Sequence, residues 1–227
     1  MRAALLCLAL CACASGPRPL PASATAAERL EAAEAAVSNA RDARVSFVTE
    51  SKGLMVAQLT GTLDLYSKNV ISLSSEGQFG SDQVHVELDT KNGDQNRSLS
   101  KGASVSNHKE PIPTELSETL GVTMVRMGLL HTVGTLTADQ PLEHANGGVR
   151  EWARAVDPKD LGPETSGEVP CHRVEFSLVV EGKQMGSSKI CIADATGLPV
   201  DRTTVVKAPQ GEMTVTERYA WSFREAR

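Results

Sequence analysis

Aromatic side chains are scarce in this chain of 227 residues: four phenylalanines, two tyrosines and two tryptophans make up 4% of it. Runs of basic residues are also missing, because the 23 lysines and arginines are interspersed among 28 acidic residues, for a net charge of −5. Such a charge pattern offers no obvious binding surface to nucleic acid or to an anionic membrane. We therefore expect no nucleic-acid partner. The remaining composition, 41% hydrophobic and 22% charged, is typical of a globular protein.

Catalytic and metal-binding motifs are missing as well. The chain has no Gly-x-Ser-x-Gly, no His-Glu-x-x-His, no phosphate-binding glycine loop and no dinucleotide fingerprint. Residues 98–101 match Ser-x-x-Lys, but the companion motifs of penicilloyl-serine enzymes are absent. The five histidines are scattered, with none at a metal-ligand spacing. We therefore predict no catalytic residue, no metal and no cofactor.

The N-terminal apolar run is too short to cross a membrane. Twelve apolar or small residues, Ala3 to Ala14, follow Arg2, whereas a transmembrane helix needs about 20. A charged start, a short apolar segment and small residues after it are typical of a secretory signal. The alternative of a buried N-terminal helix is disfavoured by the prolines at positions 17, 19 and 21. We predict that residues 1–14 are a signal region.

The end of this run, Leu10-Cys11-Ala12-Cys13, resembles the lipoprotein box of bacteria, with Cys13 as the cysteine that receives the lipid. The resemblance implies a membrane anchor at Cys13, and Ala14 after it, in place of Asp, would favour the outer membrane. Cleavage after Ala14 or after Ala24 stays open as an alternative. Residues 15–25 are rich in Pro, Ser and Ala, which indicates an extended tether or simply an irregular N-terminus.

Two of the five cysteines remain once the leader is set aside. Cys7 and Cys11 leave with it, and Cys13 is either lipidated or lost, so Cys171 and Cys191 are expected to form a disulfide in an exported chain. A turn at 181–182 would bring the two almost opposite each other, on the polar face of a hairpin. The bridge would close a loop of about 20 residues, worth roughly 3 kcal/mol.

The hydrophobic pattern predicts one domain over residues 26–227. Helical spacing begins after a capping box at Thr25 and Glu28, which predicts a helix over 26–42. Alternating apolar and polar residues predict antiparallel strands with one dry and one wet face, at 45–49, 54–66, 71–79, 84–89, 172–180, 190–192, 200–206 and 213–223. Between the two sets of strands, residues 113–136 predict a helix that is apolar over most of its circumference, and 139–161 a polar stretch with a short helix near 149–156.

This order of elements resembles the LolA/LolB-type lipoprotein carriers. The stretches that carry the resemblance are 58–65 (QLTGTLDL), 76–80 (EGQFG) and 216–223 (TERYAWSF). The family implies an α+β fold in which a curved antiparallel sheet, an incomplete barrel, has helices covering its apolar face. It also implies a non-enzymatic protein that binds a lipid or the acyl chain of a lipoprotein, either at the periplasmic face of the outer membrane or as a soluble periplasmic or secreted form.

A ligand cavity is therefore predicted between the dry sheet face and the 113–136 helix. Its expected lining comes from two strands and the helix: Met55, Leu59, Leu63, Leu120, Met124, Met127, Tyr219 and Trp221. Few aromatics and three helix glycines favour incomplete filling, because a filled core needs bulky side chains. The alternative is a filled core, in which the glycines only allow close approach and the protein binds a protein partner. An exported enzyme is the third alternative.

Two charged residues stand out against this pattern. Glu217 lies on the apolar face of the last strand, between Val215 and Tyr219, where an unpaired carboxylate would be costly. It predicts either a polar contact inside the cavity or a salt bridge at a sheet edge, unless the register is shifted. Arg126, in the apolar helix, is expected to face solvent, with a contact to ligand as the alternative.

Overall fold

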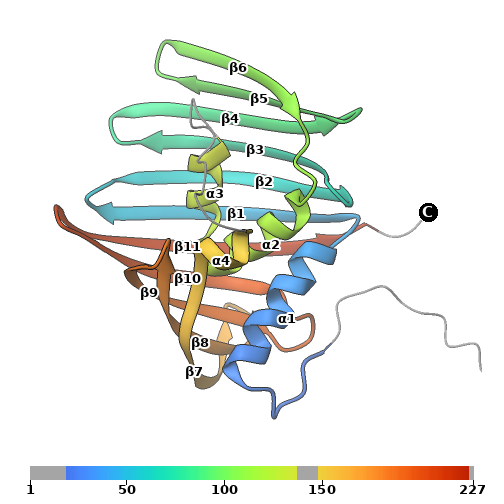
Figure 1. Ribbon diagram of the computed structural model, residues 1–227, viewed down its shortest axis with the longest axis vertical. Coiled ribbons are helices and arrows are strands. Elements are labelled where there is room, and N and C mark those ends of the chain that lie inside the picture. Colours follow the sequence, from blue (N-terminus) through green and yellow to red (C-terminus); the bar gives the residue numbers. More distant parts are fainter. Residues whose placement is uncertain (1–18, 137–147, 225–227) are drawn as a thin grey trace, which may run out of the picture.

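The computed structural model describes residues 19–136 and 148–224, and one open sheet of eleven antiparallel strands dominates it (Figure 1). The helices lie on one side of the sheet, which we call the inner face; the opposite side is the outer face. The strands are β1 (Ala43–Gly53), β2 (Ala57–Ser67), β3 (Val70–Phe79), β4 (Asp82–Lys91), β5 (Asp94–Lys101), β6 (Ser104–Pro111), β7 (Ala153–Ser166), β8 (Val169–Val180), β9 (Lys183–Ala193), β10 (Pro199–Ala208) and β11 (Gly211–Phe223). The helices are α1 (Ala26–Asn39), α2 (Leu116–Arg126), α3 (Leu129–Leu136) and α4 (Val149–Trp152).

The strand order is β6-β5-β4-β3-β2-β1-β11-β10-β9-β8-β7. Two meanders, β1 to β6 and β7 to β11, are thus joined where β1 pairs with β11, from Ala43 opposite Phe223 to Gly53 opposite Met213. This pairing brings the first and last strands together at the middle of the sheet. The expected α+β fold, an unclosed antiparallel sheet with helices on its apolar face, is confirmed.

Alternation along the strands explains why one face carries the core. In β1, the side chains of Ala43, Val45 and Phe47 are buried, while Arg44 and Ser46 between them are exposed. The same period of two continues in β2, β3 and β4. The capping box of α1 is also present, since the Thr25 hydroxyl accepts from the Glu28 amide and Glu28 accepts from the Thr25 amide.

Three strands were missed by the sequence pattern. β5 and β6 are polar on both faces except at Leu99 and Val105, and β7 carries register shifts after Val156 and after Asp160. Because alternation of apolar and polar residues was the signal for strands, segments without it were left unassigned. Pairing with a neighbouring strand is what makes them part of the sheet.

The predicted single helix over 113–136 is wrong, because Gly128 interrupts it. Helix α2 ends at Arg126, Gly128 adopts φ +92°, and α3 begins at Leu129. The short helix expected near 149–156 is α4, which ends at Trp152 where β7 begins. None of the helices in the described ranges is both long and apolar enough to span a bilayer.

The predicted disulfide between Cys171 and Cys191 is confirmed, with the two Cα atoms 5.7 Å apart. Both cysteines lie on the predicted face, with Arg173 and Lys189, but the expectation that this position is wet is wrong, because both are fully buried. Glu164 of β7 is paired with Cys171, and its carboxylate lies 3.4 Å from the Cys191 sulfur. The edge strand β7, which brings Glu164 beside the disulfide, has no apolar alternation that could reveal it.

The last part of the expected tether is docked on the domain. The Leu20 amide donates to the Asp194 carbonyl, and the Leu20 side chain packs against the core. Arg29 of α1, 1% exposed, donates to the carbonyls of Pro21 and Ala22. The fold thus holds the chain from Leu20 onward. The signal region and Cys13 lie outside the described residues.

Candidate functional site

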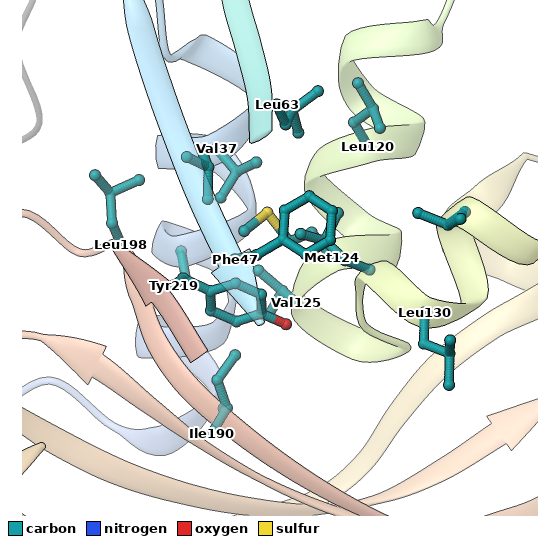
Figure 2. Close-up of a cluster of buried hydrophobic side chains, with 14 of the residues drawn as sticks. Val37, Phe47, Leu63, Leu120, Met124, Val125, Leu130, Ile190, Leu198 and Tyr219 are labelled. Atoms are coloured by element: carbon teal, nitrogen blue, oxygen red, sulfur yellow. The ribbon is translucent and has the colours of Figure 1, made fainter. Parts of the chain in front are cut away.

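Part of the predicted cavity is a packed core between α2 and the sheet (Figure 2). Leu63, Leu120, Met124 and Tyr219 lie in one cluster of buried side chains, and Leu59 belongs to the same cluster. Met124 and its neighbours Val125 and Leu129 are 0% exposed, so they border no space that a water molecule could occupy. In this half of the inner face, the filled-core alternative describes the packing.

The other predicted lining residues lie elsewhere. Met55 and Trp221 are half-buried at the margin of the same cluster, where the Trp221 indole donates to the Pro199 carbonyl at 2.8 Å. Met127 does not join them, because it packs in a second cluster with Val122, Val149, Trp152 and Ala153. It follows the end of α2, where the helical spacing that placed it beside Met124 no longer applies.

The apolar inner face continues beyond the helices. In Figure 1, α3 runs over β1 to β3, while β5 and β6 extend past every labelled helix. On β3 to β5 and in the β1–β2 turn, four apolar side chains are only partly buried yet packed against the core: Met55, Phe79, Val84 and Leu99. We call these four the open inner face. They form a partly exposed apolar surface that continues the core.

The structure has two surface hollows among the described residues, and most of the residues that line them lie away from the open inner face. One is on the outer face and is mainly polar, lined among others by Gln58, Thr60, Glu76, Gln78, His85 and Ser100. The other lies beside α4 and the β8–β9 turn, lined by Arg150, Glu151, Trp152, Arg154, Glu181, Gly182 and Lys183. Neither has the apolar lining that an acyl chain requires.

A fully buried ion pair joins the sheet to the helices. Arg202 on β10 and Glu217 on β11 are cross-strand partners, both side chains are 0% exposed, and their charged groups lie 3.2 Å apart. Glu217 accepts from the Leu130 amide at 2.8 Å, in the first turn of α3, and Arg202 donates to the carbonyl of Arg126, the last residue of α2. The carboxylate thus lies at a helix N-terminus and the guanidinium at a helix C-terminus, the ends that each charge stabilises.

Further contacts complete the coordination of this pair. The Tyr219 hydroxyl donates to Glu217 at 2.6 Å, and the Arg202 Nε donates to the Ser188 hydroxyl at 2.9 Å. The salt bridge expected for Glu217 is therefore present and its register is correct. Its place was predicted wrongly, because β11 lies inside the sheet rather than at an edge.

Gly128 is required at the corner between α2 and α3. A Cβ atom there would lie 2.0 Å from the Glu217 carboxylate and 2.1 Å from the Arg202 guanidinium. The positive φ of +92° adds a conformation that side chains disfavour. The helix therefore breaks where only a glycine can approach the ion pair.

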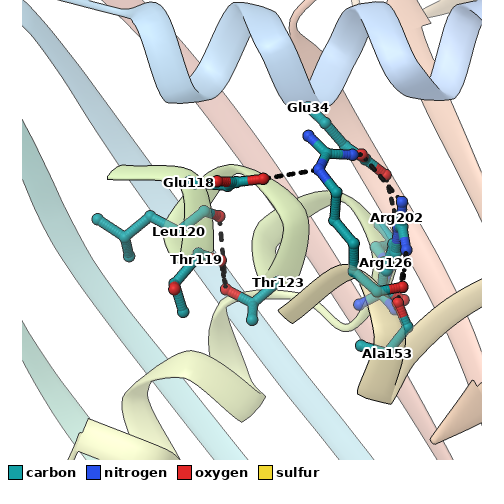
Figure 3. Close-up of polar contacts among 9 residues, drawn as sticks. Glu34, Glu118, Thr119, Leu120, Thr123, Arg126, Ala153 and Arg202 are labelled. Carbon is teal, nitrogen blue, oxygen red and sulfur yellow. Dashed lines mark hydrogen bonds and ion pairs between the residues drawn. The ribbon is translucent and has the colours of Figure 1, made fainter. Parts of the chain in front are cut away.

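A second ionic network holds α1 against α2 and α4 (Figure 3). Glu34 on α1 is 1% exposed and forms salt bridges with two arginines, Arg126 at 2.6 Å and Arg150. Arg150 forms a further salt bridge with Glu118 at 2.7 Å. Gly121 lets the helices meet, because a Cβ atom there would lie 2.0 Å from the Ser38 hydroxyl. The expectation that Arg126 faces solvent is wrong, since its side chain is 12% exposed and also donates to the Ala153 carbonyl.

Neither network could be identified fully from the sequence. Glu217 was recognisable as a charge on an apolar face. Glu34 was not, although it lies four residues after Leu30 and three before Val37 and so shares the buried face of α1. Its charge indicated a solvent-facing position, and only the closure of α2 and α4 over it supplies its partners.

The tyrosine in the ion-pair cluster predicts a dependence of stability on alkaline pH. Burial, and then the neighbouring Glu217 carboxylate, raise the pKa of Tyr219 well above its usual value. As the pH rises past about 10, the unfolded chain loses this phenol proton first. The contribution of the protonated Tyr219 to the stability of the folded state is therefore complete below pH 10 and is lost as the pH rises further.

We therefore expect the free energy of unfolding to fall above pH 10 by up to ~1.4 kcal/mol per pH unit. Urea unfolding between pH 8 and 11.5 should show this fall in the wild type and a smaller one in Tyr219→Phe. Tyr66→Phe, at the surface beside Arg224, is the control. An equal slope in wild type and Tyr219→Phe would contradict the prediction.

Comparison with known proteins gives structural neighbours only. No protein-family model matches the chain, and no curated protein matches it by sequence. Solved structures that are similar include the lipoprotein LppX of Mycobacterium tuberculosis, with a TM-score of 0.45 and 10% identity over 86% of this chain and 91% of that one. MucB of Pseudomonas aeruginosa in complex with MucA has a TM-score of 0.40 and 14% identity over 88% of this chain and 58% of that one.

A LolA superfamily protein of Nitrosomonas europaea is also similar, with a TM-score of 0.28 and 9% identity over 90% of this chain and 96% of that one. The family that the sequence resembles is therefore found among its structural neighbours. Likenesses with TM-scores below 0.5 support no conclusion about function.

Proposed function

We propose that this protein is a non-enzymatic lipoprotein of the cell envelope that binds a lipid or acyl chain on its open inner face. The observation that carries the proposal is that Met55, Phe79, Val84 and Leu99 continue the core yet remain partly exposed. An apolar surface that stays partly exposed among the described residues favours an apolar ligand. In this proposal the ligand lies over β2 to β5, beside α3, and not between α2 and the sheet.

Binding of an acyl chain is tested by a charge placed on the open inner face. In full-length protein carrying Cys13→Ala, we expect Leu99→Glu to weaken binding of a fluorescent fatty acid at least tenfold, because the ligand would have to desolvate a carboxylate. Ser100→Glu is the matched control: it adds the same charge at the next residue of β5, on the outer face, and should leave binding unchanged.

The affinity of the wild type for the fatty acid, measured by fluorescence titration, decides between an acyl ligand and a protein partner. Absence of binding, together with native mass spectra that show no co-purifying acyl mass, would contradict the proposal and favour the alternative of a protein partner. That alternative is supported by the filled half of the inner face around Met124.

The membrane anchor is proposed at Cys13. The motif of residues 10–13 supports it, and the docking of the chain that follows argues against one alternative, cleavage after Ala24. Cleavage after Ala24 would remove the carbonyls of Pro21 and Ala22 that accept from the buried Arg29. Cleavage before Cys13 keeps them.

We expect wild-type protein in the membrane fraction and Cys13→Ala in the soluble periplasmic fraction, because two or three acyl chains anchor firmly whereas none does. Cys11→Ala, which leaves the proposed lipidation site intact, is the control and should stay with the membrane. Wild-type protein that already fractionates as soluble would contradict the anchor.

A further inference from the structure

The two edge strands of the sheet differ in how well they are protected from pairing with another chain. The edge strand β7 contains Pro158, Pro163 and two register shifts, which are devices that prevent such pairing. The other edge strand, β6, lies at the top of Figure 1, and no described strand pairs with its far side. From Ser104 to Glu110 it has no proline, and it pairs with β5 in unbroken register. β6 is therefore a regular template for a further strand.

The hydrogen bonds between β5 and β6 show which backbone groups of β6 remain free. The Ile112 amide, just after β6, donates to the Gly93 carbonyl. Bonding alternates along an antiparallel pair, so the even-numbered residues of β6 bond to β5 and the odd-numbered ones point away from it. Val105, Asn107 and Lys109 thus present both N–H and C=O on the far side of the strand. We call these three residues the β6 edge.

The side chains of the β6 edge do not prevent pairing. Val105 is 64% exposed, so covering it with a second strand would remove apolar area from water. A lysine is a common protection of an edge strand, but Lys109 is bonded to Asp94 of β5 at 2.8 Å, so its charge is offset within its own sheet.

A second copy of this chain fits the β6 edge when the two strands run antiparallel about a two-fold axis at Asn107. Val105 then lies opposite Lys109 of the second copy, and the two copies of Asn107 lie opposite each other. Each such pair exchanges two backbone hydrogen bonds, so the register uses every N–H and C=O of the β6 edge. The interface is self-complementary, as a two-fold axis requires.

The side chains on the inner face of β6 favour the same register. It places Glu110 opposite Ser104 and His108 opposite Ser106, so no like charges face each other across the pair. An axis at His108 would instead put the two imidazoles opposite each other. An axis at Ser106 would move Lys109 opposite residue 103, beyond the end of the strand.

We propose that two copies of this protein pair antiparallel along β6 and form a homodimer with one continuous sheet. Three strand spacings, about 14 Å, would then separate the two copies of β5, which carries Leu99 of the open inner face. The two open inner faces would adjoin on the same side of the joint sheet. The dimer does not depend on what the open inner face binds.

The dimer is tested by sedimentation equilibrium of full-length Cys13→Ala protein. One strand pair buries less area than a standard interface, so we expect a weak dimer, half formed at about 10–100 µM. Asn107→Pro removes the N–H at the axis but no bond to β5, a place where an edge strand tolerates proline, and should weaken the dimer at least tenfold. Asn107→Ala keeps this N–H and is the matched control, with dimerisation unchanged. Thermal unfolding of both variants checks that the fold is kept.

Cysteine cross-linking tests the register without a proline variant. The Cα atoms of a hydrogen-bonded pair lie about 5.5 Å apart, within reach of a disulfide. Asn107→Cys in the Cys13→Ala protein should therefore form a covalent dimer when an added oxidant removes two electrons and two protons from the paired thiols. Val105→Cys is the control, because the two copies of this residue would lie about 14 Å apart along the strands, and it should not cross-link.

Protein that stays monomeric at every concentration and gives no cross-link at position 107 would overturn the proposal. A dimer that Asn107→Pro leaves unchanged would overturn it too, because the copies would then meet on another surface. Cross-linking of Val105→Cys as readily as Asn107→Cys would overturn the register.

Discussion

Replacing Gly128 with alanine is expected to lower the free energy of unfolding by about 4–7 kcal/mol. The new Cβ atom would lie within about 2 Å of both charged groups of the Arg202–Glu217 pair, so the pair must separate or the corner must move. Disrupting a buried ion pair costs roughly 3–5 kcal/mol, and the positive φ adds about 1–2 kcal/mol. Against a typical total of 5–15 kcal/mol, this leaves little stability.

Gly93→Ala is the matched control for this substitution. Gly93 has nearly the same backbone conformation, φ +87° against +92°, but a Cβ atom there meets nothing within 4 Å. We expect it to cost only the conformational part, about 1–2 kcal/mol. Urea unfolding followed by tryptophan fluorescence measures both. Equal losses at the two glycines would show that contact with the ion pair contributes nothing.

Replacing Arg202 with methionine is expected to cost a similar amount, about 3–5 kcal/mol, because it leaves the Glu217 carboxylate buried without its cation. It also removes the donor to the Arg126 carbonyl, so the end of α2 loses its partner. The change should therefore loosen the corner between α2 and α3 as well as the sheet. Amide hydrogen exchange should become faster at Leu130, whose N–H is bonded to Glu217.

Arg44→Met is the matched control, since it breaks an ion pair of good geometry at the surface. Arg44 is 48% exposed and bonds Asp64 at 2.8 Å, and pairs of this kind contribute about 0–1 kcal/mol. If Arg202→Met destabilises the protein no more than Arg44→Met does, the buried pair does not hold the helices as described.

The two halves of the inner face differ in how far they could be predicted. Leu63, Leu120 and Met124 were expected to meet, because alternation and helical spacing decide which side of an element a residue faces. Whether they meet across a void or in contact depends on how closely α1, α2 and the sheet approach, and Gly121 and Gly128 set those distances. A glycine in a sequence indicates only that close approach is permitted.

Strands β5 and β6 show a second limit. Gln95 and Arg97 are ordinary surface residues by type, and nothing in their spacing indicated that they are buried. They are buried because β5 and β6 continue the inner face of a sheet whose other strands carry the core. A strand recruited by backbone pairing brings its side chains to that face whatever their polarity.

By itself, the amino-acid sequence determined the α+β class, the strands with clean alternation, the capped first helix and the pairing of Cys171 with Cys191. These depend on periodicity and on short-range geometry, which a chain carries locally. Only the tertiary structure decided the break at Gly128, the central position of the Arg202–Glu217 pair and the open end of the inner face. Each of these arises where segments distant in the chain come together, so each depends on contacts that no local pattern records.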